Sequence, residues 1–307
     1  MTRNKIAFTL IVLVALLTLS VAAVAPTLTF TYKDVKAPGA TETDSYAINN
    51  AGTIAGDYVD SSGTQHGMIL SAKRKLTSFD NKKCQNTGGV TGSTAVFGIN
   101  KANAVAGWCL STQTGLPISW VYSNKKFTTI AFPKAPQTVA TGINDNGDVV
   151  GFFADSAGTA HGFVYANKKY KQLNVKGATE TAAWAIDNAG DITVYTGSSY
   201  SSGTVSCPCT SFLFKGKKQI QISDPNASST GTVVHAVNNK GDIDGTYYTS
   251  SGGTSGFLLH VGKYYDVQDP NGPTLTRADG LNDSLTIDGR YTPSSGKGNF
   301  GFEATTK

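Results

Sequence analysis

This sequence has little charge and, past its first residues, no long apolar run. Asp, Glu, Lys and Arg make up 15% of the 307 residues, against roughly 25% in an average soluble domain. A low charged fraction beside 34 glycines is typical of β proteins rich in turns. No apolar segment after residue 25 matches the roughly 20 residues that span a bilayer, so we expect no membrane span in the mature chain.

The sequence motifs of common enzymes are also missing. The chain has no G-x-S-x-G, no H-E-x-x-H, no phosphate-binding loop and no histidines at metal-ligand spacing. Its net charge of +5 falls by two, to +3, without Arg3 and Lys5. That charge is too weak to predict a basic surface for nucleic acid. We predict no nucleic-acid partner, no cofactor and no metal, and leave open whether the protein is an enzyme.

The chain begins with the features of an export signal. Arg3 and Lys5 precede an apolar core at residues 6–19, and small residues at positions 21–25 offer cleavage sites. We predict a signal peptide over residues 1–25, with an uncleaved anchor as the alternative. Residues 26–307 then form a single domain that is extracellular or held at the cell surface.

The cysteines are consistent with export, because an even number in an oxidising compartment predicts disulfides. Two disulfides among four cysteines allow three pairings. A Cys-x-Cys pair without a further ligand nearby makes a poor zinc site. The four residues are Cys84, Cys109, Cys207 and Cys209.

What the sequence does contain is a nine-residue stretch that recurs six times. In its clearest copy, residues 143–151 read INDNGDVVG. Successive copies start 43 to 51 residues apart, and a period of this length indicates a repeat fold. The copies start at Ile48, Ile99, Ile143, Ile186, Val237 and Leu281.

Each copy predicts a tight hairpin turn. The second residue is always Asn or Asp, whose short side chains bond to their own backbone, and three residues later comes Gly or Asn, which tolerate positive φ. Leu285 breaks this rule in the sixth copy, so we expect the sixth turn to adopt a different conformation.

A further element, H-G-M at residues 66–68 and H-G-F at residues 161–163, predicts structural roles for His66 and His161.

Four short strands fit within each repeat, but the sixth copy ends before its fourth strand. Residues 32–43, YKDVKAPGATET, match residues 170–181, YKQLNVKGATET, which lead into the fourth repeat. The N-terminal segment therefore reads as the missing strand. We predict an all-β, six-bladed β-propeller with four-stranded blades, closed by the N-terminal strand, in a monomeric protein.

This layout also indicates which cysteines lie close enough to pair. Cys84 lies in the link between blades one and two, and Cys109 ends the second strand of blade two, so both fall on one face of the disc. We expect them to pair, which leaves Cys207 to pair with Cys209 inside one loop.

The repeat resembles the HAF family of bacterial extracellular repeats, whose core reads A-x-G-I-N-x-x-G-x-V-x-G and is followed by H-A-F or H-G-F. The resemblance is carried by residues 143–151 with His161, Gly162 and Phe163, and by residues 48–56 with His66 and Gly67. Copies two, four and six lack the histidine, and copy five has Ser255 in its place. The resemblance implies export and a repeat fold, and it supplies no reaction and no catalytic residues.

The residue two places before each copy differs in every blade. We expect these six side chains to surround one mouth of the central channel and to form a ligand-binding ring, as a small-molecule or sugar site requires. The alternative is that they fill gaps between unequal blades. His235 and Asp279 lie in adjacent blades, and we expect them to pair and raise the histidine pKa. The six residues are Tyr46, Phe97, Thr141, Trp184, His235 and Asp279.

These observations favour an exported binding or surface-interaction module, whose partner is an extracellular glycan or another surface component. An extracellular carbohydrate-active enzyme with its site at the channel mouth is one alternative, and a purely structural surface protein is another. Two suitably spaced carboxylates at the mouth would favour the enzyme. A channel plugged by side chains would favour the structural protein.

Overall fold

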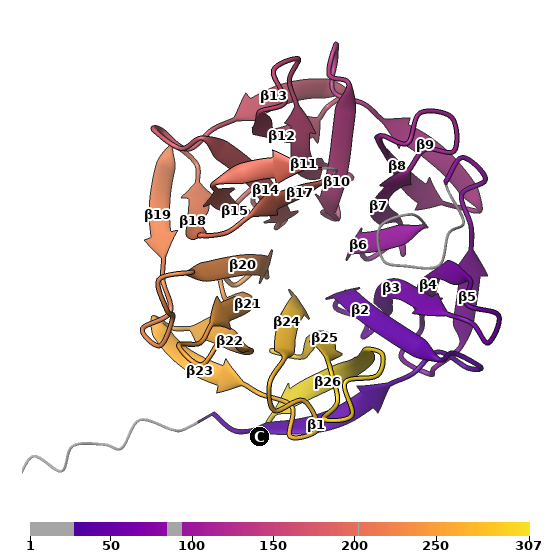
Figure 1. The fold of residues 1–307 in the computed structure, drawn as a ribbon, viewed down its shortest axis with the longest axis vertical. Helices are drawn as coiled ribbons and strands as arrows, with labels where there is room; N and C mark the ends of the chain where they lie inside the picture. Colours follow the sequence, from indigo (N-terminus) through magenta and orange to yellow (C-terminus); the bar gives the residue numbers. More distant parts are fainter. Residues whose placement is uncertain (1–27, 85–93, 202) are drawn as a thin grey trace, which may run out of the picture.

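The computed structural model describes residues 28–84, 94–201 and 203–307, so the predicted signal peptide lies outside the described residues. Within these ranges the chain forms strands and turns. Nothing in the described part is a helix long and apolar enough to cross a membrane. Six four-stranded sheets stand around a central axis like the blades of a propeller (Figure 1). The predicted all-β, six-bladed fold is confirmed.

Each of the first three blades runs from an inner first strand to an outer fourth strand (Figure 1). Blade one consists of β2 (Glu42–Ile48), β3 (Ile54–Val59), β4 (Gln65–Leu70) and β5 (Leu76–Phe79). Blade two consists of β6 (Ala95–Ile99), β7 (Val105–Leu110), β8 (Pro117–Ser123) and β9 (Lys126–Ile130). Blade three consists of β10 (Gln137–Ile143), β11 (Val149–Ala154), β12 (Ala160–Ala166) and β13 (Lys169–Leu173).

Blade four carries an inserted hairpin between its second and third strands. Its sheet consists of β14 (Glu180–Ile186), β15 (Ile192–Gly197), β18 (Thr210–Lys215) and β19 (Lys218–Ile222). The hairpin consists of β16 (Ser199–Ser201) and β17 (Thr204–Ser206). Blade five consists of β20 (Thr232–Val237), β21 (Ile243–Tyr248), β22 (Thr254–His260) and β23 (Lys263–Val267).

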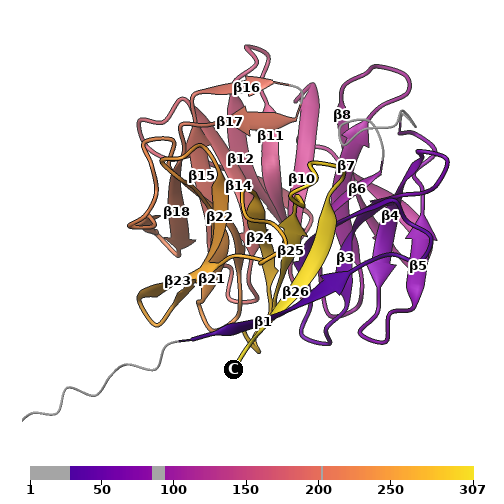
Figure 2. The ribbon, with the colours of Figure 1, turned by 60° about the horizontal axis from the view of Figure 1, so that its bottom comes forward.

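Blade six is built from both ends of the chain. Its strands are β24 (Thr276–Leu281), β25 (Ile287–Tyr291), β26 (Phe300–Thr306) and the N-terminal β1 (Phe30–Val35). Strand β1 pairs antiparallel with β26, with Phe30 opposite Thr306 and Val35 opposite Gly301 (Figure 2). The predicted closure by the N-terminal strand is confirmed, and it leaves no open end in the ring of blades.

The leading Asx residue of each repeat shapes its turn and joins it to the next blade. In blade three, Asn144 Oδ1 accepts hydrogen bonds from the backbone N–H groups of Asn146 and Asp148. Its Nδ2 donates to the carbonyl oxygen of Asp187 in blade four, at 2.9 Å. Asp187 interrupts this ring of amide links, because an ionised carboxylate has no donor. The other amide donors are Asn49, Asn100, Asn238 and Asn282.

A second ring of interblade bonds uses the residue that follows the Asx. The backbone N–H of Lys101 donates to Asp145 Oδ1 at 2.7 Å, and that of Asp145 donates to Asn188 Oδ1 at 2.9 Å. Equivalent bonds join blades four to five, five to six and six to one. The repeated motif is therefore a joint between blades, which explains why it recurs.

The prediction of a different sixth turn is wrong. Leu285 has a φ of 57°, next to 58° for Asn103 in blade two. Its N–H donates to the carbonyl oxygen of Asn282 at 3.1 Å, as that of Gly147 does to Asn144 at 3.1 Å. The hydrogen bonds that the N–H groups of residues 284–286 donate to Asn282 close the same turn with leucine in a left-handed conformation that its side chain disfavours.

The H-G-F element fills the blades with large apolar side chains. Strands β4, β12, β22 and β26 each place one such residue directly after a glycine, with no exposed surface. These residues are Met68, Phe163, Phe257 and Phe302.

Candidate functional site

Each variable residue predicted from the sequence lies at a β-bulge. In blade one, Ser45 pairs with Gly56 and Ala47 with Ala55, which leaves Tyr46 without an opposite residue. A bulge re-aims a side chain out of the regular alternation of the strand. In blade four the shift is wider and includes Ala185. The bulged residues of the other blades are Phe97, Thr141, Trp184, His235 and Asp279.

A glycine in the second strand makes room for this bulge. A Cβ atom on Gly151 would lie 1.9 Å from the carbonyl oxygen of Val139, which no real contact allows. Blade four has Val194 at this position, which accounts for its wider register shift. The corresponding distances are 2.0 to 2.2 Å at Gly56, Gly107, Gly245 and Gly289.

Beyond the bulges, on the side away from the Asx turns, the channel widens into a cavity of about 400 Å³. Tyr46, Phe97, Trp184 and His235 line it. Asp279 lines a narrower part of the channel, of about 80 Å³. The bulges thus bring five of the six predicted side chains to the channel.

Thr141 is the predicted site residue that packs into the wall instead. Its side chain is buried, with 1% of its surface exposed. Its hydroxyl donates to the carbonyl oxygen of Ala183 in blade four, at 3.0 Å. This contact joins blades three and four, so Thr141 serves the gap-filling role that was the alternative for the whole ring.

Aromatic rings form an arc along the cavity wall. The ring centroid of Phe97 lies 4.7 Å from that of Tyr46 and 5.7 Å from that of Trp184. Trp184 lies 5.7 Å from His235, and Trp108 stacks on Phe97 at 6.3 Å. These contacts fix flat apolar faces from blades one, two and four at the mouth, beside the imidazole of blade five.

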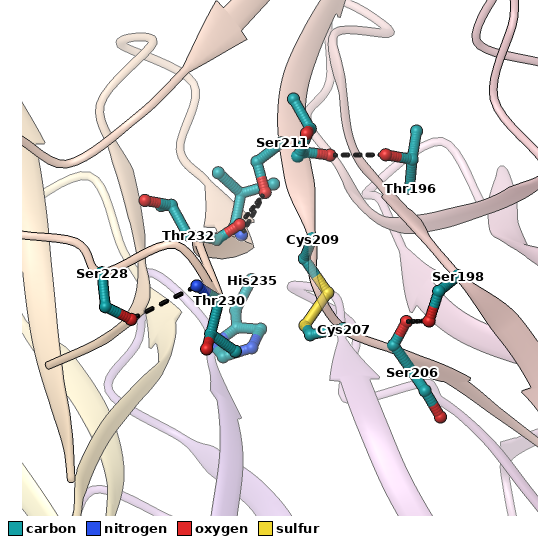
Figure 3. Close-up of a disulfide and its surroundings, with 12 residues drawn as sticks. Thr196, Ser198, Ser206, Cys207, Cys209, Ser211, Ser228, Thr230, Thr232 and His235 are labelled. Atoms are coloured by element: carbon teal, nitrogen blue, oxygen red, sulfur yellow. Dashed lines mark hydrogen bonds between the residues drawn. A yellow bond between two sulfur atoms is a disulfide. The ribbon is translucent and has the colours of Figure 1, made fainter. Parts of the chain in front are cut away.

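The inserted hairpin of blade four provides another wall. Val205 and Cys207 line the cavity, and the Tyr200 hydroxyl donates to Gln137 Oε1 in blade three at 2.7 Å. A disulfide lies at the base of this hairpin (Figure 3). Both predicted pairings are confirmed, namely Cys84 with Cys109 and Cys207 with Cys209.

His235 and Asp279 pair as expected, but the predicted direction of the pKa shift is wrong. The His235 Nδ1 and Asp279 Oδ1 atoms lie 3.2 Å apart, and both side chains are 1% exposed. Burial lowers the pKa of His235 to about 4; Asp279 opposes the shift, and Arg277 adds to it. The imidazole is therefore neutral at pH 7.

The contacts of His235 also define its tautomer. Nδ1 lies 2.7 Å from the carbonyl oxygen of Ala278, and Nε2 lies 3.1 Å from Nη2 of Arg277. A carbonyl accepts and a guanidinium donates, so Nδ1 carries the hydrogen and Nε2 is the acceptor.

A second arginine faces the aromatic arc. The Arg290 guanidinium lies 4.4 Å from the ring centroid of Tyr46. Its Nε lies 3.7 Å from Asp44 Oδ1, and its Nη1 lies 3.9 Å from Asp279 Oδ2. Burial favours the neutral form of Asp279, but the charges of Arg277 and Arg290 outweigh burial and hold its pKa below the usual value. Asp279 is therefore the ionised partner of both arginines.

Other carboxyl groups are buried in the wall of blades one, five and six. Burial raises the pKa of Asp57, Asp244 and Asp288 well above the usual value. These groups add little negative charge to the channel. Across the described ranges, no three His, Cys, Asp or Glu side chains are placed to hold a metal ion.

Sequence reasoning missed Arg277, Arg290, Trp108 and Tyr195, all of which line the cavity. Arg277 stands four residues before its repeat, and the other three stand nine residues after the start of theirs. The residue type at these two positions of the repeat also differs between copies; the later position, for example, is aspartate in the first copy and tryptophan in the second. Variation at equivalent positions of the repeat is thus the signal that would identify them.

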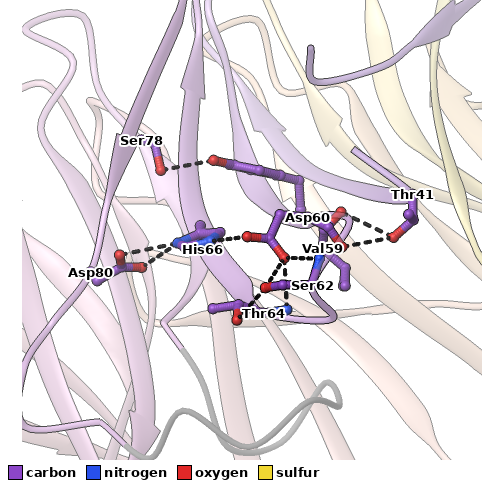
Figure 4. A network of polar contacts seen from close by, with 9 residues as sticks. Thr41, Val59, Asp60, Ser62, Thr64, His66, Ser78 and Asp80 are labelled. Atoms are coloured by element: carbon purple, nitrogen blue, oxygen red, sulfur yellow. Dashed lines mark hydrogen bonds and ion pairs between the residues drawn. The ribbon is translucent and has the colours of Figure 1, made fainter. Parts of the chain in front are cut away.

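The histidines of the H-G-F element lie in loop networks away from the cavity. His66 Nδ1 lies 3.0 Å from the carboxylate of Asp80, and its Nε2 lies 3.3 Å from Asp60 Oδ2 (Figure 4). His161 Nε2 lies 3.1 Å from Asp155 Oδ2. In blades one and three the histidine thus contacts the aspartate of the loop before the third strand, which is a structural role.

The solved structures with a similar fold have low sequence identity to this chain. The SapL1 lectin, solved in complex with α-methyl fucoside, has a TM-score of 0.55 and 12% identity over 87% of this chain and 94% of its own. The Aleuria aurantia lectin, solved with Fucα1-6GlcNAc, has a TM-score of 0.53 and 11% identity over 92% of this chain and 94% of its own. TolB from Acinetobacter baumannii has a TM-score of 0.51 and 8% identity over 88% of this chain and 66% of its own. At these identities the likeness shows the fold alone.

No protein-family model matches the chain, and no curated protein matches it in sequence. The resemblance to HAF repeats therefore stays a prediction.

Proposed function

We propose that this protein is an exported carbohydrate-binding β-propeller with its site in the 400 Å³ cavity at the channel mouth. The observation that carries the proposal is the aromatic arc of Tyr46, Phe97 and Trp184, which faces polar groups of blades five and six across one cavity. Sugar rings present both an apolar C–H face and hydroxyl groups, so they suit a wall of aromatic faces with a few placed polar groups.

The similar solved structures support this proposal at the level of the fold. Two of them are lectins that were solved with fucose-containing ligands. They show that proteins with a similar fold bind sugars, although their identities of 11 and 12% transfer no residue to this chain.

The alternatives have less support. Among the described residues that line the cavity, none is a carboxylate, whereas glycoside hydrolysis commonly uses two. A purely structural protein would have a plugged channel, yet the cavity measures about 400 Å³. Sugar binding accounts for both the open space and the type of side chain around it.

The two disulfides support export, because disulfides persist in oxidising compartments. Together with the predicted signal over residues 1–25, they favour an extracellular or surface location. We infer the same location from the HAF-like repeats. N-terminal sequencing of secreted protein would identify the cleavage site.

A glycan array followed by calorimetry tests the proposed function. We expect the mature protein to bind a defined set of glycans, and Trp184→Ala to weaken that binding at least about tenfold, as the loss of an aromatic anchor does. Tyr165→Ala is the matched control, because Tyr165 is a partly buried aromatic residue of β12 in blade three. Equal binding by both variants, with unchanged melting temperatures, would contradict a site at the channel mouth.

A further inference from the structure

The charge on the cavity wall has one sign. Among the described residues that line the cavity, the side chains that are ionised at pH 7 are Arg277 and Arg290, both from blade six. Asp279, the carboxylate that they share, is 1% exposed and lies in the narrower part of the channel. A ligand in the cavity therefore meets guanidinium groups, with the compensating carboxylate behind them.

Arg277 keeps hydrogen-bond donors that the protein does not use. Its side chain is 29% exposed. Nη2 contacts His235 Nε2 at 3.1 Å and Asp279 Oδ1 at 3.4 Å, while Nε is buried and has no partner among the described residues. A guanidinium holds five N–H donors in a planar fork that matches the two oxygens of a carboxylate. Because Nε is buried, the part of the fork that a ligand in the cavity can reach is its terminal end, Nη1 and Nη2.

His235 positions this guanidinium without neutralising it. Its Nδ1–H is engaged by the carbonyl oxygen of Ala278 at 2.7 Å, so its neutral Nε2 accepts from Arg277. A carboxylate in the place of His235 would have cancelled the charge of Arg277. The neutral imidazole instead orients the arginine, and the one ionised carboxylate beside it, Asp279, is shared with Arg290, so two guanidinium groups face one carboxylate.

The aromatic arc adds the second half of a recognition surface. Phe97 and Trp184 meet edge to face, at 5.7 Å and 76°, and both line the cavity with Arg277. A sugar acid combines an apolar ring face with a carboxylate. We propose that the ligand is a carboxylated saccharide whose ring packs on the aromatic arc and whose carboxylate binds Arg277. This inference rests on the proposed function and narrows its ligand class.

Matched pairs of uronic acid oligosaccharides and their neutral methyl esters test the proposal. Glucuronate, galacturonate and mannuronate oligomers are titrated into the mature protein by calorimetry, each beside its ester. We expect at least one acid to bind about ten- to a hundredfold more tightly than its ester, which is the usual strength of hydrogen bonds to a charged group. We expect Arg277→Gln to bring the acid to the affinity of the ester.

The controls separate charge, geometry and folding. Arg74→Gln is the matched variant, because Arg74 is also 29% exposed and pairs with a carboxylate, that of Glu303 at 2.5 Å, away from the cavity. It should keep the full preference for the acid. Arg277→Lys keeps the charge but not the planar fork, so it should retain part of the preference. Unchanged melting temperatures show that the variants are folded.

Three outcomes would contradict the proposal in distinguishable ways. Equal affinity for acids and esters, lost in Trp184→Ala, would overturn the acidic class and leave the carbohydrate site in place. Preference for sulfated over carboxylated sugars would also overturn it. Binding of no sugar, acidic or neutral, would overturn the proposed function itself.

Discussion

Replacing Asp187 by asparagine should complete the ring of amide links around the propeller axis. At the equivalent position in the neighbouring blade, Asn144 donates to the carbonyl oxygen of Asp187 at 2.9 Å. The Oδ1 of Asp187 already accepts from the N–H of Asp191 at 2.8 Å, and an amide oxygen can keep that bond. The new Nδ2 would gain the carbonyl oxygen of Asn238 as its acceptor.

One buried hydrogen bond contributes about 0.5–1.5 kcal/mol to stability. For a protein of this size, the expected rise in melting temperature is about 1–5 °C. The measurement is thermal and urea unfolding with the disulfides intact. Asn100→Asp is the reverse control, because it removes the link from Asn100 to Asn144 at 3.2 Å, and it should lower the melting temperature by a similar amount.

The gain from Asp187→Asn should also depend on pH. Burial raises the pKa of Asp187 above its usual value, and the charge of Asp191 adds to this. A raised folded-state pKa means that the wild type loses stability as pH rises from the unfolded pKa of about 4 towards the folded one. The variant lacks this loss, so its advantage should be larger at pH 7 than at pH 4. A melting temperature unchanged or lowered at pH 7, while Asn100→Asp is destabilising, would refute the reasoning.

Two further substitutions test the turn and the bulge. Gly151→Ala should lower the free energy of unfolding in urea by at least about 3 kcal/mol, because its Cβ would lie 1.9 Å from the Val139 carbonyl oxygen. The control Gly147→Ala, where φ is 83° but the space is open, should lower it by only about 1 kcal/mol. Equal losses in the two variants would contradict the steric account. Leu285→Asn should raise the stability measured by thermal unfolding by about 1 kcal/mol, since φ is 57° there. Asn103→Leu should lower the stability. A less stable Leu285→Asn variant would show that apolar packing of the leucine outweighs its backbone strain.

The repeat was sufficient to predict the architecture, because every copy imposes the same local chemistry. The Asx turn and the matching segments at residues 32–43 and 170–181 identify the blades and the closing strand. The interblade bonds of Asn144 depend on how blades stand side by side, so no single copy reveals them. Leu285 misled the turn prediction because the bonds to Asn282 within its own turn outweigh the conformational preference of leucine.

The candidate site was predictable in position and less so in chemistry. Variation before each repeat pointed to His235 and Asp279, but the sequence does not show burial, and burial decides the charge of His235. Its pKa of about 4 reverses the expected shift because desolvation acts more strongly than the nearby carboxylate. Arg277 and Arg290 required a comparison of all inward positions across the copies.

The bulge separates the demands of folding from those of recognition. The turn before each second strand takes part in interblade bonds, and in five blades the residue beside the bulge has to be glycine, because a Cβ atom there would lie near 2 Å from a carbonyl oxygen, as at Gly151. The bulged residue itself leaves the strand alternation, and in every blade but the third, where Thr141 packs into the wall, its side chain reaches the channel. These five positions can change their chemistry blade by blade, from the aromatic face of Trp184 to the carboxylate of Asp279, while the backbone that holds them stays the same. Ligand specificity in this fold can therefore change through the bulged residues and the inward residues beside them, where the copies differ most.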